Sequence, residues 1–312
     1  PCYRVTQHIT EVIENIPEMV SAIYIIDDAC PEKSGALVLE QVQDKRLSVI
    51  FHDKNQGVGG AVMTGYKAAI DDGHDVIVKV DGDGQMDPKL IPIFIAPILE
   101  GEADYTKGNR FFNLEEIRTM PKMRLFGNAV LSFLTKISSG YWNLFDPTNG
   151  FTAIHVDVAK LLPFNRISTR YFFETDMLFR LNTLRAVVFD IPMDAKYGDE
   201  ESNLKISKII GEFLFKHVRN FFKRIFYNYY LRDMSLASLE LPLGVIAFNF
   251  GVIFGSYQWI QSWSAGYSSS AGTVMLSALP IIVGLQLILG FFHYDISSVP
   301  SRPIHKMTKF KK

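Results

Sequence analysis

The chain has 312 residues, 32 of them basic and 33 acidic, and a formal net charge of −1. This length allows one large domain or two smaller ones, and the even balance of charge argues against a nucleic-acid binder that works through bulk positive charge. The two cysteines, Cys2 and Cys30, lack the spacing of a zinc or redox site.

Residues 1–202 alternate short β-branched runs with amphipathic segments, a pattern that predicts a mostly parallel sheet covered by helices. The chain opens on Pro1-Cys2-Tyr3 without a leading strand, so we expect that a first strand precedes it. The predicted strands are 22–27, 47–51, 76–80, 105–108, 150–155 and 186–191, and the clearest helices are 60–72 and 122–136.

Residues 203–234 read as a basic amphipathic helix. Charged residues recur every three or four residues, namely Lys205, Lys208, Glu212, Lys216, Arg219 and Lys223, and isoleucines and phenylalanines fill the other side. Such a helix can pack on a protein core. Because a charge-free region follows within a few residues, we favour a helix that lies in the headgroup layer of a membrane.

Residues 235–296 contain two apolar segments, about 239–260 and 272–292, joined by a stretch rich in Ser and Gly. No Asp, Glu, Lys or Arg occurs from Leu241 to Tyr294. Each segment has about the ~20 residues that cross a bilayer, so we predict a transmembrane hairpin rather than two buried helices of a soluble protein.

Basic residues beside the two segments predict their orientation. Seven Lys or Arg lie between Lys205 and Arg232 and five between Arg302 and Lys312, while the connecting loop has none. We therefore expect a multi-pass protein of the inner (plasma) membrane, with its large N-terminal domain and its basic tail, 297–312, in the cytosol.

The strongest chemical signal follows the strand at 76–80. It ends in Asp81-Gly82-Asp83-Gly84-Gln85, which places two carboxylates one residue apart on a tight turn. Such oxygen ligands suit Mg²⁺ or Mn²⁺. A calcium-binding EF-hand loop is disfavoured because the segment follows a strand and lacks the Glu at its twelfth position. A turn without any ligand is the remaining alternative.

Two further segments lie at predicted strand ends. Asp27 and Asp28 end the strand at 22–27, at the edge where open α/β sheets bind ligands. The run 55–61 contains Gly57 and Gly59, which let the backbone approach a ligand or a neighbouring strand closely. No Gly-Lys-Ser/Thr follows, so this run is not a P-loop.

Taken in order, these motifs resemble the inverting GT-A glycosyltransferases of family 2. More specifically, residues 1–230 look like the polyprenyl-phosphate glycosyltransferases typified by dolichol-phosphate mannose synthase, and the two apolar segments are similar to those of bacterial members. Further matches are Gly108-Asn109-Arg110, Arg124 with Asn128, Asp146 to Phe151, and Phe173 to Met177. The resemblance implies an α/β GT-A fold with a Rossmann-like, mostly parallel sheet.

The resemblance also implies roles for individual residues. Asp81, Asp83 and Gln85 match the metal-binding pattern, and Asp27 or Asp28 would contact the base or ribose of the nucleotide. Asp176 would be the base for a hydroxyl acceptor, with Glu174 beside it; for a lipid phosphate, both would position substrate groups together with Asp146. Arg110 and Arg124 match basic positions expected near the phosphates, and the other expected substrate-binding positions are Pro1, Tyr3, Gly57 and Gly59. Lys205 and Lys208 are further candidates to hold the acceptor phosphate by charge-assisted hydrogen bonds; attraction to anionic lipid is the other interpretation of these two lysines.

The expected reaction is metal-dependent transfer of a sugar from a UDP- or GDP-linked donor to a polyprenyl phosphate at the membrane. The expected partners are the donor, the acceptor and the lipid bilayer, without nucleic acid, and homo-oligomers are compatible with the sequence. One alternative is a membrane-tethered, non-catalytic nucleotide-sugar-binding protein. Another is a polysaccharide or O-antigen glycosyltransferase with a hydroxyl acceptor, although the Gln-x-x-Arg-Trp pattern of processive synthases is absent.

Overall fold

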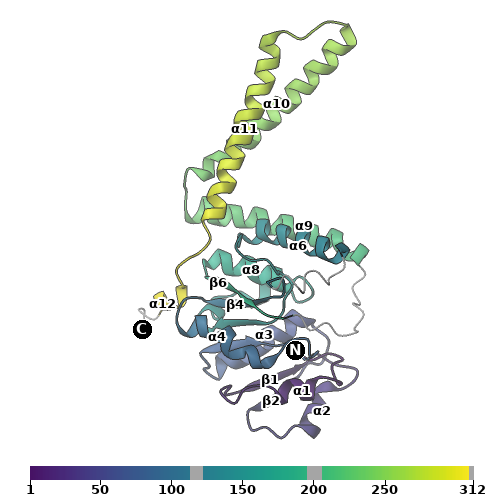
Figure 1. Cartoon of the computed structure of the whole chain (residues 1–312), viewed down its shortest axis with the longest axis vertical. Coiled ribbons are helices and arrows are strands. Elements are labelled where there is room, and N and C mark those ends of the chain that lie inside the picture. The colour runs from purple at the N-terminus through teal and green to yellow at the C-terminus, as the bar shows by residue number, and fades with distance from the viewer. Residues whose placement is uncertain (113–121, 195–205, 309–312) are drawn as a thin grey trace. The chain divides into compact units, whose positions relative to one another are not determined.

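The structure is a computed structural model of residues 1–312, and it describes all of them except 113–121, 195–205 and 309–312. The chain forms two compact units (Figure 1). The first comprises Pro1–Phe221 and Pro300–Lys312, and the second comprises Phe222–Val299. The division between the units falls inside the helix predicted for residues 203–234.

The first unit is an α/β domain, and this confirms the predicted fold class. Strand β1 (Ile23–Asp27) pairs in parallel with β2 (Leu47–Phe51). A second sheet has the order β3-β5-β4-β6, formed by β3 Val76–Lys79, β4 Tyr105–Asn109, β5 Thr152–His155 and β6 Val188–Pro192. β4 and β6 are parallel, whereas β5 runs antiparallel to both of its neighbours. The parallel pairs follow the prediction, and β5 is the exception.

Helices cover these strands. They are α1 Ile9–Glu14, α2 Ser34–Gln41, α3 Val58–Asp71, α4 Ile91–Leu99, α6 Lys122–Ser139, α7 Val156–Ala159 and α8 Phe173–Leu184, with single 3₁₀ turns at Pro88–Leu90 and Phe164–Arg166. α4 packs on the second sheet, where the ring of Phe94 stacks on Phe151 with 3.9 Å between centroids. α3 and α6 agree with the helices predicted at 60–72 and 122–136 to within three residues at each end.

The C-terminal segment of the first unit is anchored by one buried carboxylate. Helix α12 (Ile304–Thr308) begins where Asp104 accepts hydrogen bonds from the backbone N–H groups of Ile304 and His305, at 2.9 and 3.0 Å. The His305 ring stacks on His155 with 4.3 Å between centroids. Residues 304–307 of the predicted basic tail thus pack on the domain through His305 and Asp104.

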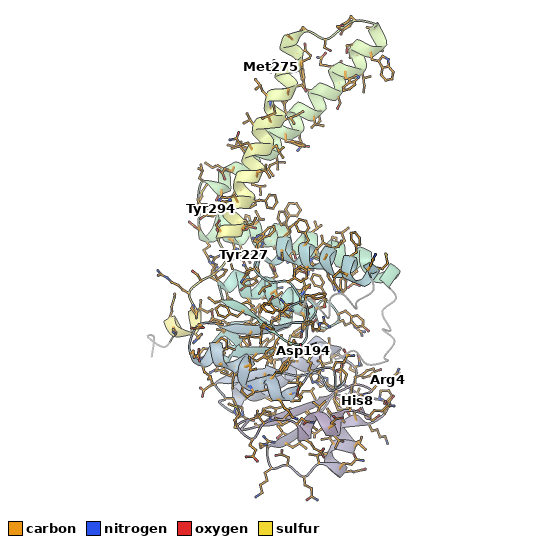
Figure 2. All side chains as sticks on the ribbon, viewed as in Figure 1. Arg4, His8, Asp194, Tyr227, Met275 and Tyr294 are labelled. Atoms are coloured by element: carbon orange, nitrogen blue, oxygen red, sulfur yellow. The ribbon has the colours of Figure 1, made fainter. Side chains whose placement is uncertain are left out.

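The second unit is a helical hairpin. Helix α9 (Ile206–Phe226) crosses into it and is followed by a π-helical segment, Tyr227–Arg232, and by α10 (Ala237–Ala265) and α11 (Ala271–Ser297). α10 and α11 are each long and apolar enough to cross a membrane. Most of their side chains are exposed, and Figure 2 shows Met275 projecting from α11. Such exposure distinguishes the pair from the core helices of a soluble protein.

Small residues hold the hairpin together. A Cβ atom on Gly284 would lie 2.5 Å from the backbone nitrogen of Phe248, and one on Gly244 would lie 2.9 Å from the carbonyl oxygen of Gly284. Ser277 Oγ donates to the carbonyl of Gly251 at 3.1 Å. Close backbone approach of this kind is how helices associate in lipid, where burial of apolar surface supplies no driving force.

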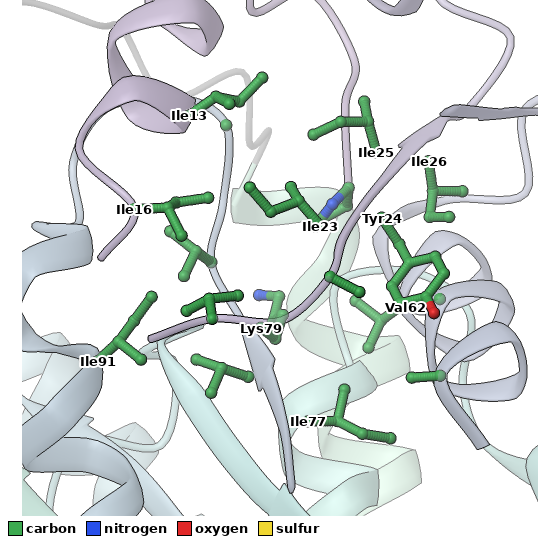
Figure 3. A pocket seen from close by; sticks show the side chains of 18 of the residues that line it. Ile13, Ile16, Ile23, Tyr24, Ile25, Ile26, Val62, Ile77, Lys79 and Ile91 are labelled. Carbon is green, nitrogen blue, oxygen red and sulfur yellow. The ribbon is translucent and has the colours of Figure 1, made fainter. Parts of the chain in front are cut away.

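A cavity of about 240 Å³ separates β1 from β3 (Figure 3), lined mainly by apolar side chains such as Ile13, Ile23 and Ile77. β1 bonds to β2 through one edge, and at its other edge the carbonyl of Ile26 accepts a hydrogen bond from the N–H of Cys2 at 2.9 Å. Cys2 already pairs in parallel with Asp27 at its end.

Candidate active site

The two-carboxylate loop follows β3 directly. Asp83 accepts a hydrogen bond from the backbone N–H of Gln85 at 3.0 Å, which fixes the turn. The Asp81 side chain is 24% exposed, and its Oδ2 accepts from Lys79 Nζ at 3.0 Å. Asp81 Oδ1 lies 2.9 Å from the same ammonium and is buried without a hydrogen bond of its own. The Lys79 ammonium therefore contacts both oxygens of this carboxylate.

Lys79 was missed by the sequence analysis. Its side chain is 3% exposed, and its ammonium lies between Asp81 and Glu174, whose Oε1 is 3.5 Å away. Burial alone would lower the pKa of Lys79, but the two carboxylates raise it above its ordinary value. Burial raises the pKa of Glu174, and Lys79 opposes that shift. A charged residue inside the apolar run 76–80 was the available signal.

Gly150 brings a third segment against this pair. A Cβ atom at this position would lie 2.4 Å from both Asp81 Oδ2 and Lys79 Nζ, closer than any real side chain permits. Only glycine lets the loop between 146 and 151 pass over the ion pair. β3, the loop before β5 and the first turn of α8 therefore meet at Asp81.

Arg110 and Asp146 form a bidentate ion pair at the other end of the same loop. Arg110 Nε donates to Asp146 Oδ2 at 2.8 Å, and Nη2 donates to Oδ1 at 3.0 Å. Burial would raise the pKa of Asp146, but the hydrogen bonds from Arg110 and the charge of Lys107 hold it below its ordinary value. Arg110 is 23% exposed, so its guanidinium is fixed by Asp146 and still reaches solvent.

Asp176, one of the predicted catalytic residues, is enclosed by protein contacts. It is fully buried, its Oδ2 accepts from the backbone N–H of Ser168 at 2.9 Å, and its Oδ1 accepts from Asn220 Nδ2 at 3.0 Å. These contacts tie α8 to the preceding loop and to α9. Glu174, two residues earlier, is the carboxylate of this helix that adjoins Asp81.

Asp27 and Asp28 are both buried, and backbone groups occupy their oxygens. Asp27 accepts from the N–H groups of Cys30 and Gly35, both at 2.7 Å. Asp28 accepts from those of Gln56 and Gly57, both at 2.8 Å, and its Oδ1 lies 2.7 Å from His52 Nδ1. The described contacts therefore give both carboxylates a role in shaping the loops. Contact with a nucleotide stays a prediction.

The glycine run packs against protein backbone. Gly57 has φ +86°, and a Cβ atom there would lie 2.5 Å from the carbonyl oxygen of Thr169. Gly59 donates its N–H to the same carbonyl at 2.9 Å, and a Cβ on it would lie 2.6 Å from the ring of Phe173. Of the two interpretations that the sequence left open, the described contacts favour close approach to a neighbouring segment.

The remaining predicted positions are divided between described and undescribed parts of the chain. The carbonyl of Pro1 lies 3.5 Å from where a Cβ on Gly82 would stand, beside the carboxylate loop, and Tyr3 is 43% exposed. Arg124 belongs to α6, but its side chain lies outside the described residues, as do all of Lys205 and the side chain of Lys208. Their predicted phosphate contacts stay predictions.

The donor atoms of the loop fit a small divalent cation. Among the described residues, no group of three or more His, Cys, Asp or Glu could hold a metal, so the loop offers the two carboxylates with Gln85 beside them. Mg²⁺ and Mn²⁺ sites that act on phosphates are commonly built this way, from one or two carboxylates completed by the substrate. Both oxygens of Asp81 lie within 3.0 Å of the Lys79 ammonium, so a bound cation would share this carboxylate with Lys79.

The sequence of the chain matches known proteins over most of its length. The family model "Glycosyl transferase family 2" matches residues 1–162. A UDP-N-acetylglucosamine–dolichyl-phosphate N-acetylglucosaminyltransferase of Methanococcus voltae is 27% identical over 68% of this chain and 89% of that protein. An undecaprenyl-phosphate mannosyltransferase of Micrococcus luteus is 27% identical over 63% of this chain and 80% of that protein.

Solved structures agree on the fold. The glucosyl-3-phosphoglycerate synthase of Mycobacterium tuberculosis, in complex with Mn²⁺, UDP-glucose and phosphoglyceric acid, superposes with a TM-score of 0.54 and 15% identity. The match covers 72% of this chain and 77% of that one. The GT-A fold and the resemblance to the polyprenyl-phosphate group are thus confirmed, and the chain belongs to glycosyl transferase family 2 and is a glycosyltransferase.

Proposed function

We propose that this glycosyltransferase moves a sugar from a nucleotide-linked donor to a polyprenyl phosphate at the cytosolic face of a membrane, with Mg²⁺ or Mn²⁺ as cofactor. The observation that carries the proposal is one chain that combines the Asp81-x-Asp83 loop, placed against Glu174 and Gly150, with two exposed apolar helices long enough to cross a bilayer. The relatives named for dolichyl and undecaprenyl phosphates support the acceptor class.

Asp81 and Asp83, with Gln85, would hold the metal. A divalent cation bound there would offset the negative charge that develops on the leaving diphosphate. Arg110, held by Asp146 and 23% exposed, would bind a phosphate oxygen by a charge-assisted hydrogen bond. Lys79 would keep the Asp81 carboxylate in place before the donor arrives.

The environment of Asp176 favours a phosphate acceptor over a hydroxyl acceptor. A hydroxyl must lose a proton as it attacks, and Asp176, predicted to be the base in that case, is buried with both oxygens occupied. A phosphomonoester has its second pKa near ~6, so it is already an anionic nucleophile at neutral pH. This acceptor class needs no base at that position.

A transfer assay tests the proposal. Membranes that contain the full chain are incubated with a panel of radiolabelled UDP- and GDP-sugars and with polyprenyl phosphate, with Mn²⁺ or with excess EDTA. We expect one donor to give lipid-extractable label, which EDTA and Asp83→Ala abolish and which Glu40→Ala, a change on the exposed face of α2, leaves intact. Undiminished product in EDTA or from Asp83→Ala would refute the metal mechanism, and label on a lipid-free glycan alone would refute the acceptor.

A further inference from the structure

Polar side chains form one row across the second sheet. Thr152 of β5 pairs with Lys79 of β3 on one side and with Lys107 of β4 on the other. Lys107 in turn pairs with Asp190 of β6. Partners at the same level of neighbouring strands project from the same face of a sheet. Lys79 and Lys107 are 4% and 1% exposed, so this face holds two buried ammonium groups at one level.

The two lysines differ in their contacts. Lys79 Nζ lies 2.9 Å from Asp81 Oδ1 and 3.5 Å from Glu174 Oε1. Lys107 Nζ is buried without a hydrogen-bond partner among the described residues. Asp190 Oδ1, on the neighbouring strand, is buried without one as well. A buried ammonium that makes no hydrogen bond destabilises a fold, so packing alone does not explain a lysine at position 107.

The loop that carries Asp146 passes the end of this row. Asp190 Oδ2 accepts a hydrogen bond from the backbone N–H of Phe145 at 3.0 Å. Asp146 Oδ2 accepts from the backbone N–H of Arg110, three residues after Lys107, at 3.2 Å. Burial lowers the pKa of Lys107, and the charge of Asp146 opposes that shift more than any other charge does. Lys107 is thus a second positive charge beside the Asp146 carboxylate.

The first positive charge beside Asp146 is Arg110, which occupies both of its oxygens through Nε at 2.8 Å and Nη2 at 3.0 Å. These two donors reach a phosphate only if they leave Asp146. Asp146 is 0% exposed, and a buried carboxylate that loses its partner is strongly unfavourable. A second cation removes this obstacle, because the carboxylate keeps a counter-ion when the guanidinium turns away.

We propose that Lys107 is a positioning residue for sugar transfer and acts as the second counter-ion of Asp146. When a nucleoside diphosphate binds, the Arg110 guanidinium exchanges Asp146 for a phosphate oxygen. The Lys107 ammonium, on its flexible four-carbon stem, then moves to the Asp146 carboxylate. Lys107 touches no substrate and acts only through Arg110. The inference rests on the proposed function, which makes a phosphate the ligand of Arg110.

A double-mutant cycle on diphosphate binding tests this exchange in the full chain. Its four proteins are the wild type, Lys107→Met, Arg110→Ala and the variant with both changes. Lys107→Gln is carried through the same cycle, so that the result does not depend on one replacement folding. The probes are UDP and GDP, each with Mn²⁺, titrated calorimetrically into protein in detergent. Lys45→Met, at an exposed position before β2, is the control.

We expect both changes at Lys107 to weaken binding of the diphosphate that the wild type takes up by about ten- to a hundredfold, the contribution of a hydrogen bond to a charged group. In the Arg110→Ala protein the same changes should have no further effect, and Lys45→Met should bind like the wild type. An equal loss in both backgrounds would show a purely structural lysine and overturn the proposal, as would undiminished binding by the single variants. A wild type that binds neither diphosphate would overturn the proposed function and this inference with it.

Discussion

Lys79 Nζ lies 2.9 Å from Asp81 Oδ1, inside the site and nearly out of contact with water. The positive charge of this ammonium allows the carboxylates of Asp81 and Glu174 to lie on either side of it. Replacing it with an uncharged side chain would leave two carboxylates facing each other at low dielectric, a costly arrangement.

Lys79→Met should therefore destabilise the fold by about 3–5 kcal/mol, as expected when one partner of a buried ion pair is removed. Adding Glu174→Gln should recover part of that loss, because it removes one of the two uncompensated charges. Denaturant unfolding of the wild type, both single variants and the double variant in detergent measures the coupling. A Lys79→Met protein as stable as the wild type would show that the ion pair contributes nothing.

The sequence predicted most helices and strands, but not the hydrogen-bond partners of individual carboxylate oxygens, for a physical reason. Apolar periodicity located β1 to β4 and α3, because burial of one face determines that pattern. Asp81 and Asp83 were found because a turn after a strand exposes its side chains. Whether Asp28 binds a ligand or the N–H of Gly57 depends on a tertiary contact 29 residues away, which no local pattern encodes. The direction of β5 depends on tertiary packing in the same way.

Gly150→Ala should separate activity from stability. The added methyl group would lie 2.4 Å from Asp81 Oδ2, so the carboxylate must move, and a displacement of about 1 Å in a catalytic group costs about a hundredfold in rate. Gly65→Ala on α3 is the matched control, because its new Cβ meets only ordinary contacts with Ile26 at 3.5 Å. Initial transfer rates and thermal midpoints are compared for both. Near-wild-type transfer by Gly150→Ala would mean that the position of Asp81 does not matter.

Asp176→Asn tests whether this carboxylate is a base or a structural acceptor. An amide cannot accept from both Ser168 N–H and Asn220 Nδ2, so a buried donor is left unpaired at a cost of about 1–3 kcal/mol. We expect a lower unfolding midpoint, with turnover per folded molecule changed only a few-fold and with an unchanged pH profile.

In the double variant Asp176→Asn with Asn220→Asp, the amide at position 176 can donate to the carboxylate at position 220. This variant should therefore recover stability. If the single variant instead folds normally and loses turnover with an altered pH profile, Asp176 is the base and the acceptor is a hydroxyl.

His217 gives the fold a predictable pH dependence. Burial lowers its pKa from 6.5 to about 4, against a smaller opposing effect of a hydrogen bond to the backbone of Leu134. The unfolded chain therefore takes up a proton below about pH 6.5 that the folded chain refuses until about pH 4. The contribution of neutral His217 to the free energy of unfolding is fully present above the unfolded pKa of about 6.5. It is lost as the pH falls from there to about 4, by up to about 3 kcal/mol.

His217→Gln lacks this titration, so its unfolding midpoint should decline less than that of the wild type between pH 7.5 and pH 4.5. Equal declines would mean that His217 is protonated in the folded state, and the Ser138–His217 contact between α6 and α9 would then form with a charged imidazole.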